Sequence, residues 1–193
     1  MAVASLGLQV HGGMGFIEET GAAQYLRDAR ITTIYEGTTG IQANDLIGRK
    51  VGYEKGATAF AVIAEMRGLD PVLEDLGAEY ESTRSNFTSG IDALEAATRW
   101  LVDTFEKDPN AAAAVAVPYL ELFGTVAGGW VMARAAVIAQ RKLDEPGSDR
   151  EYLTAKLATA RFYGEHLLPK ARAQADTVLS GSASVLGLDD ALF

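Results

Sequence analysis

The sequence predicts an all-α protein in two unequal parts. Hydrophobic residues make up 48% of the 193 residues, charged residues make up 22%, and prolines number only 5, which is typical of a folded helical chain. After residue 53, apolar residues recur at helical spacings. Before it, two glycine-containing segments, HGGMG and YEGTTG, interrupt the helical pattern. We therefore expect one region over 1–53 and a second over 54–193.

Short helices are predicted in the first region. Residues 2–10 match the end of a helix that stops at Gly12-Gly13, where a positive φ costs little. A second helix is expected to begin at Thr20, a favourable N-cap residue, and to continue through Arg30. The glycines between them therefore predict a tight helix–helix turn.

The third helix of this region is expected after an extended link. The β-branched stretch 31–34 disfavours a continuing helix and predicts extended backbone. A helix is then expected to start at Thr38 or Thr39. It should run to Arg49 and Lys50, whose charges suit the C-terminal end of a helix dipole.

The second region is predicted to form an antiparallel helical bundle. One helix is expected over 57–67, ended by Gly68 and a turn at Asp70-Pro71, and a short helix is expected over 72–80. The pair Asp108-Pro109 should close one long helix and open the next, because proline is favoured at the first helical position.

Three apolar stripes predict the buried faces of the long helices. Their members are Phe87, Ile91, Leu94, Leu101 and Phe105, then Tyr119, Phe123, Val126, Trp130, Ala133 and Val137, then Leu153, Leu157, Ala160 and Leu167. Proline lacks a backbone N–H and clashes with the preceding turn. Pro118 is therefore expected to bend or break the second of these helices, and Pro169 to kink the third.

Composition and charge exclude several functions. A net charge of -9 argues against nucleic acid as a partner. Without cysteine there is no disulfide, cysteine-ligated metal or thiol nucleophile, and the 2 histidines are too far apart in sequence for a metal motif. No uninterrupted apolar run approaches the roughly 18 residues of a membrane span. We expect no metal site, no membrane span and a cytoplasmic location.

Two segments could carry chemistry. The run HGGMG resembles a phosphate loop only loosely, because it follows a predicted helix and lacks the spacing of known phosphate loops. Glu36 precedes Gly37 at a turn before a helix. Its carboxylate could complement the helix dipole, or it could act as a general base in an apolar pocket. Spacing alone leaves both interpretations open.

A family resemblance favours the second interpretation. The segments LQVHGGMGF and YLRDARITTIYEGTTGIQ, in this order and separation, resemble the C-terminal signature of acyl-CoA dehydrogenases. These flavoenzymes introduce an α,β double bond into acyl-CoA thioesters. The two segments cover about the first 50 residues of the chain. The resemblance implies an FAD cofactor, an acyl-CoA substrate, an electron acceptor such as an electron-transfer flavoprotein, and a homo-oligomer.

The resemblance also implies roles for particular residues. Glu36 corresponds to the base that removes the α-proton, and the backbone at Glu36 and Gly37 corresponds to the site of the thioester carbonyl. Thr38 would lie near the FAD of its own subunit. The resemblance further implies contacts with the FAD of a neighbouring subunit by three residues: Gln9, Gly12 and Gly13.

The sequence departs from the family pattern in two places. Many members carry Gln or Glu where this chain has Gly40, so a side-chain contact to FAD is expected to be missing there. Met14 replaces the usual tyrosine, which we interpret as a packing substitution.

Residues 54–193 resemble the extra C-terminal helical domain of a larger bacterial subgroup of the family. That domain is expected to pack subunits together or to cover the acyl site. The family's N-terminal helical domain and middle β-domain have no counterpart in the sequence. We therefore expect a C-terminal fragment of an FAD-dependent acyl-CoA dehydrogenase that is inactive by itself. The alternative is a non-catalytic helical oligomerisation or assembly module, in which YEGT is a structural turn.

Overall fold

The computed structural model describes residues 1–143 and 145–192, and within these residues the regular structure is entirely helical. This confirms the predicted all-α class. The chain folds into two compact units, Met1–Gln42 and Ala43–Phe193, and each is described by itself.

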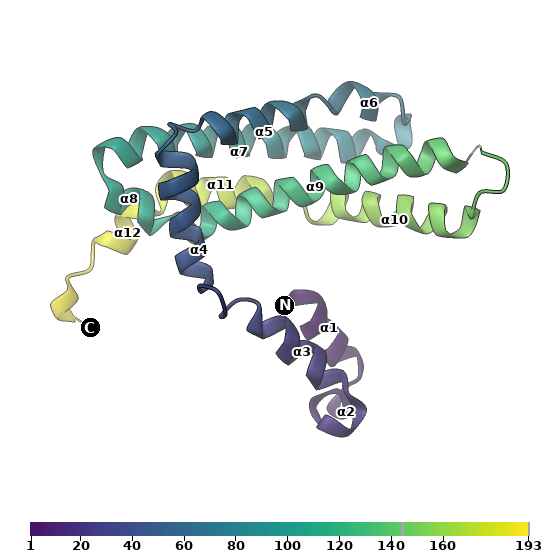
Figure 1. Ribbon diagram of the computed structural model, residues 1–193, viewed down its shortest axis with the longest axis horizontal. Coiled ribbons are helices and arrows are strands. Elements are labelled where there is room, and N and C mark those ends of the chain that lie inside the picture. The colour runs from purple at the N-terminus through teal and green to yellow at the C-terminus, as the bar shows by residue number, and fades with distance from the viewer. Residues whose placement is uncertain (144, 193) are drawn as a thin grey trace. The chain divides into compact units, whose positions relative to one another are not determined.

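The first unit is built around a helical hairpin. Helix α1 (Ala2–Val10) packs against α3 (Ala22–Ile31), and the short α2 (Gly13–Phe16) and η1 (Glu18–Thr20) connect them (Figure 1). The predicted turn at Gly12-Gly13 is confirmed, with Gly12 at a φ of 61°.

Two local predictions for this unit are wrong. Helix α3 is preceded by Gly21 at a φ of 75° rather than capped by Thr20, because the Thr20 hydroxyl donates to the carbonyl of Met14 at 2.7 Å instead. Residues 32–36 form hydrogen-bonded turns rather than an extended link. The hydroxyls of Thr32 and Thr33 donate back to carbonyls three residues earlier, which supports a turn despite the β-branched side chains.

The chain then continues through α4 (Thr39–Asp45) into the π-helical segment η2 (Leu46–Gly52). The predicted helix start at Thr38 or Thr39 is therefore confirmed. Ala43, Ile47 and Val51 belong to the core of the second unit. For this reason the boundary between the two units lies before η2, whereas the sequence pattern places it between 53 and 54.

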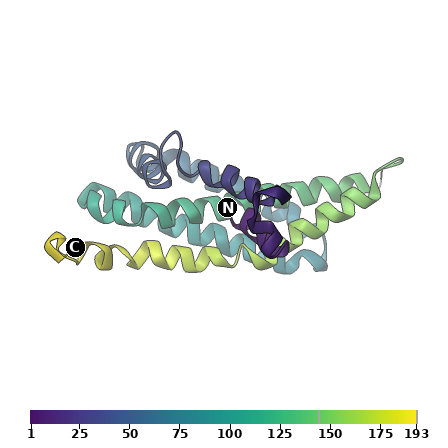
Figure 2. The same cartoon turned by 90° about the horizontal axis from the view of Figure 1, so that it is seen from below.

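The second unit is an antiparallel helical bundle (Figures 1 and 2). Its main helices are α5 (Ala57–Arg67), α7 (Glu81–Lys107), α9 (Ala116–Leu143), α10 (Arg150–His166) and α11 (Lys170–Ser180). Shorter elements are α6 (Asp70–Glu74), η3 (Ala78–Tyr80), α8 (Pro109–Ala114), α12 (Ser182–Leu186) and η4 (Asp190–Leu192). Helix α9 contacts α7, α10 and α11, and α7 contacts α5 as well as α9, α10 and α11, so these two helices form the centre of the bundle.

Three prolines, Pro71, Pro109 and Pro118, lie in the first turns of helices. Pro71 opens α6 instead of forming the predicted turn, and the predicted helix over 72–80 is divided between α6 and η3. Pro109 opens α8, where the carboxylate of Asp108 accepts hydrogen bonds from the N–H groups of Asn110 and Ala111, each at 3.1 Å. The break predicted near Pro118 occurs at Val115, which places Pro118 in the first turn of α9.

The predicted stripes form much of the core. Most of their members are buried, while Phe105, Phe123 and Trp130 are only partly buried and pack against it. In the third stripe the deeply buried residue is Leu168 rather than Leu167, because α10 ends at His166 and the chain turns before Pro169. A kink was predicted at Pro169, and the structure has a full break there, with Pro169 preceding the first residue of α11.

Helix α9 is long and apolar enough, by length and composition alone, to cross a membrane. Helix α9 packs against α7, α10 and α11, and many of its apolar residues lie in the core of the bundle. The expectation from the sequence rests on uninterrupted apolar runs, and the charged residues Glu121 and Arg134 interrupt the run in α9.

Candidate active site

The turn between α3 and α4 holds Glu36, Gly37 and Thr38 in an unusual backbone conformation. Glu36 has a φ of 55° and Gly37 a φ of 98°. A positive φ is common for glycine but costly for glutamate, whose Cβ crowds the backbone. Non-glycine residues in such conformations are concentrated at functional sites, where surrounding contacts maintain them.

Three hydrogen bonds fix this turn. The side-chain amide of Gln42 donates from Nε2 to the carbonyl of Glu36 at 2.7 Å. The N–H of Thr39 donates to the carbonyl of Thr33 at 3.3 Å, which closes the loop at its base. The hydroxyl of Thr38 accepts from the N–H of Ile41 at 3.4 Å and so caps α4.

Glu36 itself is available for chemistry. Its side chain is exposed, and among the described residues its carboxylate forms no hydrogen bond or ion pair. Because Thr38 provides the cap of α4, the carboxylate of Glu36 is not needed for that purpose. Its backbone N–H and that of Gly37 form no hydrogen bond within the described part of the chain. The turn therefore places two unpaired backbone N–H groups, those of Glu36 and Gly37, next to the free carboxylate of Glu36.

The second group of predicted residues lies in the turn from α1 to α2. The N–H of Gly12 donates to the carbonyl of Gln9 at 3.0 Å, which closes the turn. A Cβ added to Gly12 or Gly13 would meet nothing within 4 Å, so the backbone there is open to a ligand. Gly15 has a different role, because a Cβ there would overlap the carbonyl of Leu8.

The structure does not bring the two groups together. Gln9, Gly12 and Gly13 lie near the start of α3, and Glu36 and Thr38 follow its end. At a rise of about 1.5 Å per residue, α3 separates them by roughly 15 Å. The two groups therefore belong to different positions on the surface of the first unit.

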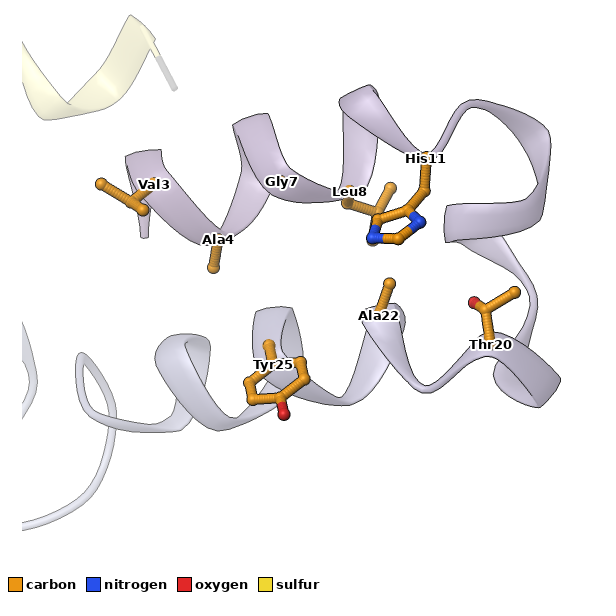
Figure 3. Close-up of a pocket in the computed structure, with 8 residues that line it drawn as sticks. All are labelled: Val3, Ala4, Gly7, Leu8, His11, Thr20, Ala22 and Tyr25. Carbon is orange, nitrogen blue, oxygen red and sulfur yellow. The ribbon is translucent and has the colours of Figure 1, made fainter.

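A groove of about 430 Å³ lies between α1 and α3 (Figure 3). Its lining is mostly apolar: Val3, Ala4, Gly7, Leu8, His11, Thr20, Ala22 and Tyr25. Figure 3 shows His11 from the end of α1 facing the side that carries Ala22 and Thr20. No sequence signal indicates this groove, because the two helices face each other only after the turn has formed.

Sequence reasoning also missed Gln42. Its side chain reaches from the first turns of α4 back to Glu36, much as a capping residue reaches back over a helix start. A glutamine close behind a glycine turn is the only signal that could have indicated it. Within residues 1–143 and 145–192, no group of three or more His, Asp or Glu side chains is arranged to hold a metal ion.

Two family models match the chain. The model described as "Acyl-CoA dehydrogenase, C-terminal domain" matches residues 1–51. The model described as "Acetyl-CoA dehydrogenase C-terminal like" matches residues 60–189, which is more than half of the chain.

Curated relatives agree with these matches. The chain is 43% identical to a 3-methylmercaptopropionyl-CoA dehydrogenase of Ruegeria pomeroyi, over 95% of this chain and 31% of the relative. It is 28% identical to a broad-specificity linear acyl-CoA dehydrogenase of Mycobacterium tuberculosis, over 96% of this chain and 32% of the relative. It is 31% identical to a butyryl-CoA dehydrogenase of Syntrophomonas wolfei, over 84% of this chain and 27% of the relative. The chain thus spans about three tenths of the length of these relatives. With both models and these relatives in agreement, the chain belongs to the acyl-CoA dehydrogenase family.

Proposed function

We propose that the protein carrying this chain is an FAD-dependent acyl-CoA dehydrogenase that forms an α,β double bond in acyl-CoA thioesters. The supporting observation is the Glu36 turn, where a free carboxylate adjoins two unpaired backbone N–H groups. We further propose that the 193 residues alone do not turn over, because they span only about three tenths of the length of the relatives.

In this proposal Glu36 is the general base. Its carboxylate takes the proton from the α-carbon of the thioester, a step in which a positioned base contributes typically about 10²–10⁴-fold. The N–H groups of Glu36 and Gly37 donate to the thioester carbonyl, on which negative charge develops as the proton leaves. The same turn thus supplies both the base and the electrostatic stabilisation.

The residues around the turns fit an FAD cofactor. Open glycine backbone at Gly12 and Gly13 admits close approach of a flat or phosphorylated group, and Thr38 lies at a helix start suited to a phosphate. When bound, FAD would accept the hydride that leaves the β-carbon. Gly40 offers a backbone N–H near Thr38 but no side chain, which is consistent with a missing contact there.

We propose that the two groups of residues serve different flavins. Thr38 and Glu36 would face the FAD of their own subunit, while Gln9, Gly12 and Gly13 would contact that of a neighbour. Their separation along α3 supports this division and hence a homo-oligomer. An electron acceptor such as an electron-transfer flavoprotein and a cytoplasmic location complete the proposal.

The division of the chain and the choice of substrate are also part of this proposal. Residues 1–53 would form the flavin-contact and catalytic-base segment, and 54–193 a helical extension. Family-model matches that change between residues 51 and 60 support this boundary. The substrates named for the relatives, 3-methylmercaptopropionyl-CoA and butyryl-CoA, are the first acyl-CoA thioesters to try.

The test is anaerobic addition of these two thioesters to the FAD-loaded protein that carries this chain. The flavin absorbance should bleach, and Glu36→Gln should keep its flavin while losing at least about 100-fold in bleaching rate. The control is Glu121→Gln, which alters an exposed glutamate on α9 and should bleach normally. Unchanged bleaching in Glu36→Gln would refute the role of Glu36, and a protein without flavin would favour the assembly module.

A further inference from the structure

The side chain of Gln42 lies across the Glu36 turn. Its Nε2 atom donates to the Glu36 carbonyl at 2.7 Å, while its backbone N–H donates to the carbonyl of Thr38, just before α4, at 2.9 Å. The same amide lies over Gly37, where an added Cβ would come within 3.0 Å of Nε2. Gln42 is therefore joined to the helix on one side and to the turn on the other.

The conformation of Glu36 needs such support. A glutamate at a φ of 55° is less favourable than one at negative φ, so an untied turn would tend to relax. Among the described residues, Gln42 is the only one whose side chain hydrogen-bonds to the backbone of Glu36. The other bonds of the turn hold Thr33, Thr38 and the start of α4 instead.

We propose that Gln42 is a positioning residue that holds Glu36 in its left-handed conformation and thereby directs its carboxylate toward the substrate α-carbon. This inference rests on the function proposed above. Rotation about φ turns the Cβ and the carbonyl of Glu36 together relative to the preceding peptide, so a carbonyl held by Gln42 restricts the direction in which the side chain leaves the backbone. Loss of the tie would misplace the base without removing it.

The first test is structural and needs no cofactor. In the 193-residue chain, a strong intraresidue HN–Hα nuclear Overhauser effect at Glu36 would report its positive φ. Gln42→Ala removes the whole side chain, and Gln42→Glu keeps nearly the same shape but cannot donate when ionised. Both should weaken this signal. Gln24→Ala removes an amide that bonds Asp28 on α3, so it is the matched control and should leave the signal unchanged.

The second test is kinetic and uses the FAD-loaded protein that carries this chain. Displacing a reacting group by about 1 Å can lower the rate by about 10²-fold. Gln42→Ala and Gln42→Glu should therefore lower kcat by about 10- to 100-fold while KM changes by less than about threefold. Gln24→Ala should match the unsubstituted protein.

The outcomes separate this inference from the function on which it rests. If Glu36→Gln abolishes turnover but both Gln42 variants keep full kcat, or if their Glu36 signal does not change, Gln42 is not a positioning residue. If Glu36→Gln turns over normally, the proposed function fails. Loss of both kcat and the Glu36 signal in Gln42→Glu, with flavin retained, supports the positioning role over a packing role.

Discussion

At the scale of single residues, the most buried polar pair of the bundle joins α7 to α9. The hydroxyls of Thr98 and Tyr119 lie 2.9 Å apart, and the Thr98 hydroxyl also donates to the carbonyl of Leu94 at 2.7 Å. Thr98 must then accept from Tyr119, because its single proton is already donated. Both side chains are fully buried, so neither hydroxyl can exchange this bond for water.

Tyr119→Phe should lower the free energy of unfolding by about 1 kcal/mol near neutral pH, since it removes one buried hydrogen bond. Urea denaturation at a fixed pH measures this difference. An effect within about 0.3 kcal/mol of zero would contradict the network described above.

The same tyrosine should make stability depend on alkaline pH. Burial raises the pKa of Tyr119 to about 12, from its ordinary value of 10.0. The unfolded chain therefore loses this proton first, and stability present below about pH 10 declines as pH rises toward 12. The advantage of the unsubstituted protein over Tyr119→Phe should shrink by about 1 kcal/mol between about pH 9 and 11. If the difference in the free energy of unfolding between the two proteins did not change with pH, the burial of the Tyr119 hydroxyl would be contradicted.

Not every residue of the site could be predicted from the sequence. Glu36 and Gly37 were predicted because their motif is specific. The positive φ of Glu36 could not be predicted, because glutamate has no intrinsic preference for it and the Gln42 amide that bonds the Glu36 carbonyl lies six residues further along the chain. Gly15 was missed because only the folded hairpin brings Leu8 against it.

At the scale of elements, two glycines of α9 have opposite surroundings. A Cβ at Gly129 would overlap the side chain of Leu168, whereas a Cβ at Gly124 would meet nothing within 4 Å. Gly129 thus permits close packing beside the break between α10 and α11. Gly124 makes no such packing contact, so its main effect is the conformational entropy that glycine loses when the helix forms.

Alanine at these two positions should change stability in opposite directions. Gly129→Ala should destabilise the chain by about 1–3 kcal/mol through overpacking. Gly124→Ala should stabilise it by up to about 1 kcal/mol through helix propensity. Thermal or urea unfolding of both variants measures the two changes in the free energy of unfolding. Equal changes in the two variants would contradict the close packing of Gly129 against Leu168.

Helix positions in the bundle were largely predictable because apolar spacing and proline are strong local signals. Helix α5 and the boundary at Asp108-Pro109 illustrate this. The stretch 31–34 was mispredicted because β-branching was weighed without the threonine hydroxyls, which bond back to the preceding turn. The π-helical form of η2 has no comparable sequence signal.

At the scale of the whole molecule, the two units differ in how much they bury. In residues 1–42 the buried positions are Gly15 and Ala23, while the second unit buries large side chains such as Phe87 and Tyr119. In the first unit several apolar side chains are exposed, including Val3 at 83% and Phe16 at 79%. A unit with so small a core gains little stability from burial.

Amide hydrogen exchange should reveal this difference. In the 193-residue chain, amides of α1 and α3 should exchange at least about tenfold faster than those of α7 and α9, because local opening of the first unit exposes little apolar surface. Mass spectrometry of peptides from each helix measures these rates. Equal protection of α1 and α9 would contradict the difference in burial between the units.

The central claim, that Glu36 removes the α-proton, is tested most directly by isotope exchange. The FAD-loaded protein is incubated without an electron acceptor in D₂O with butyryl-CoA, and deuterium at the α-carbon is followed by mass spectrometry. The unsubstituted protein should incorporate deuterium, and Glu36→Gln, with the same flavin content, should do so at least about 100-fold more slowly. Equal incorporation by both proteins would show that another group removes the proton.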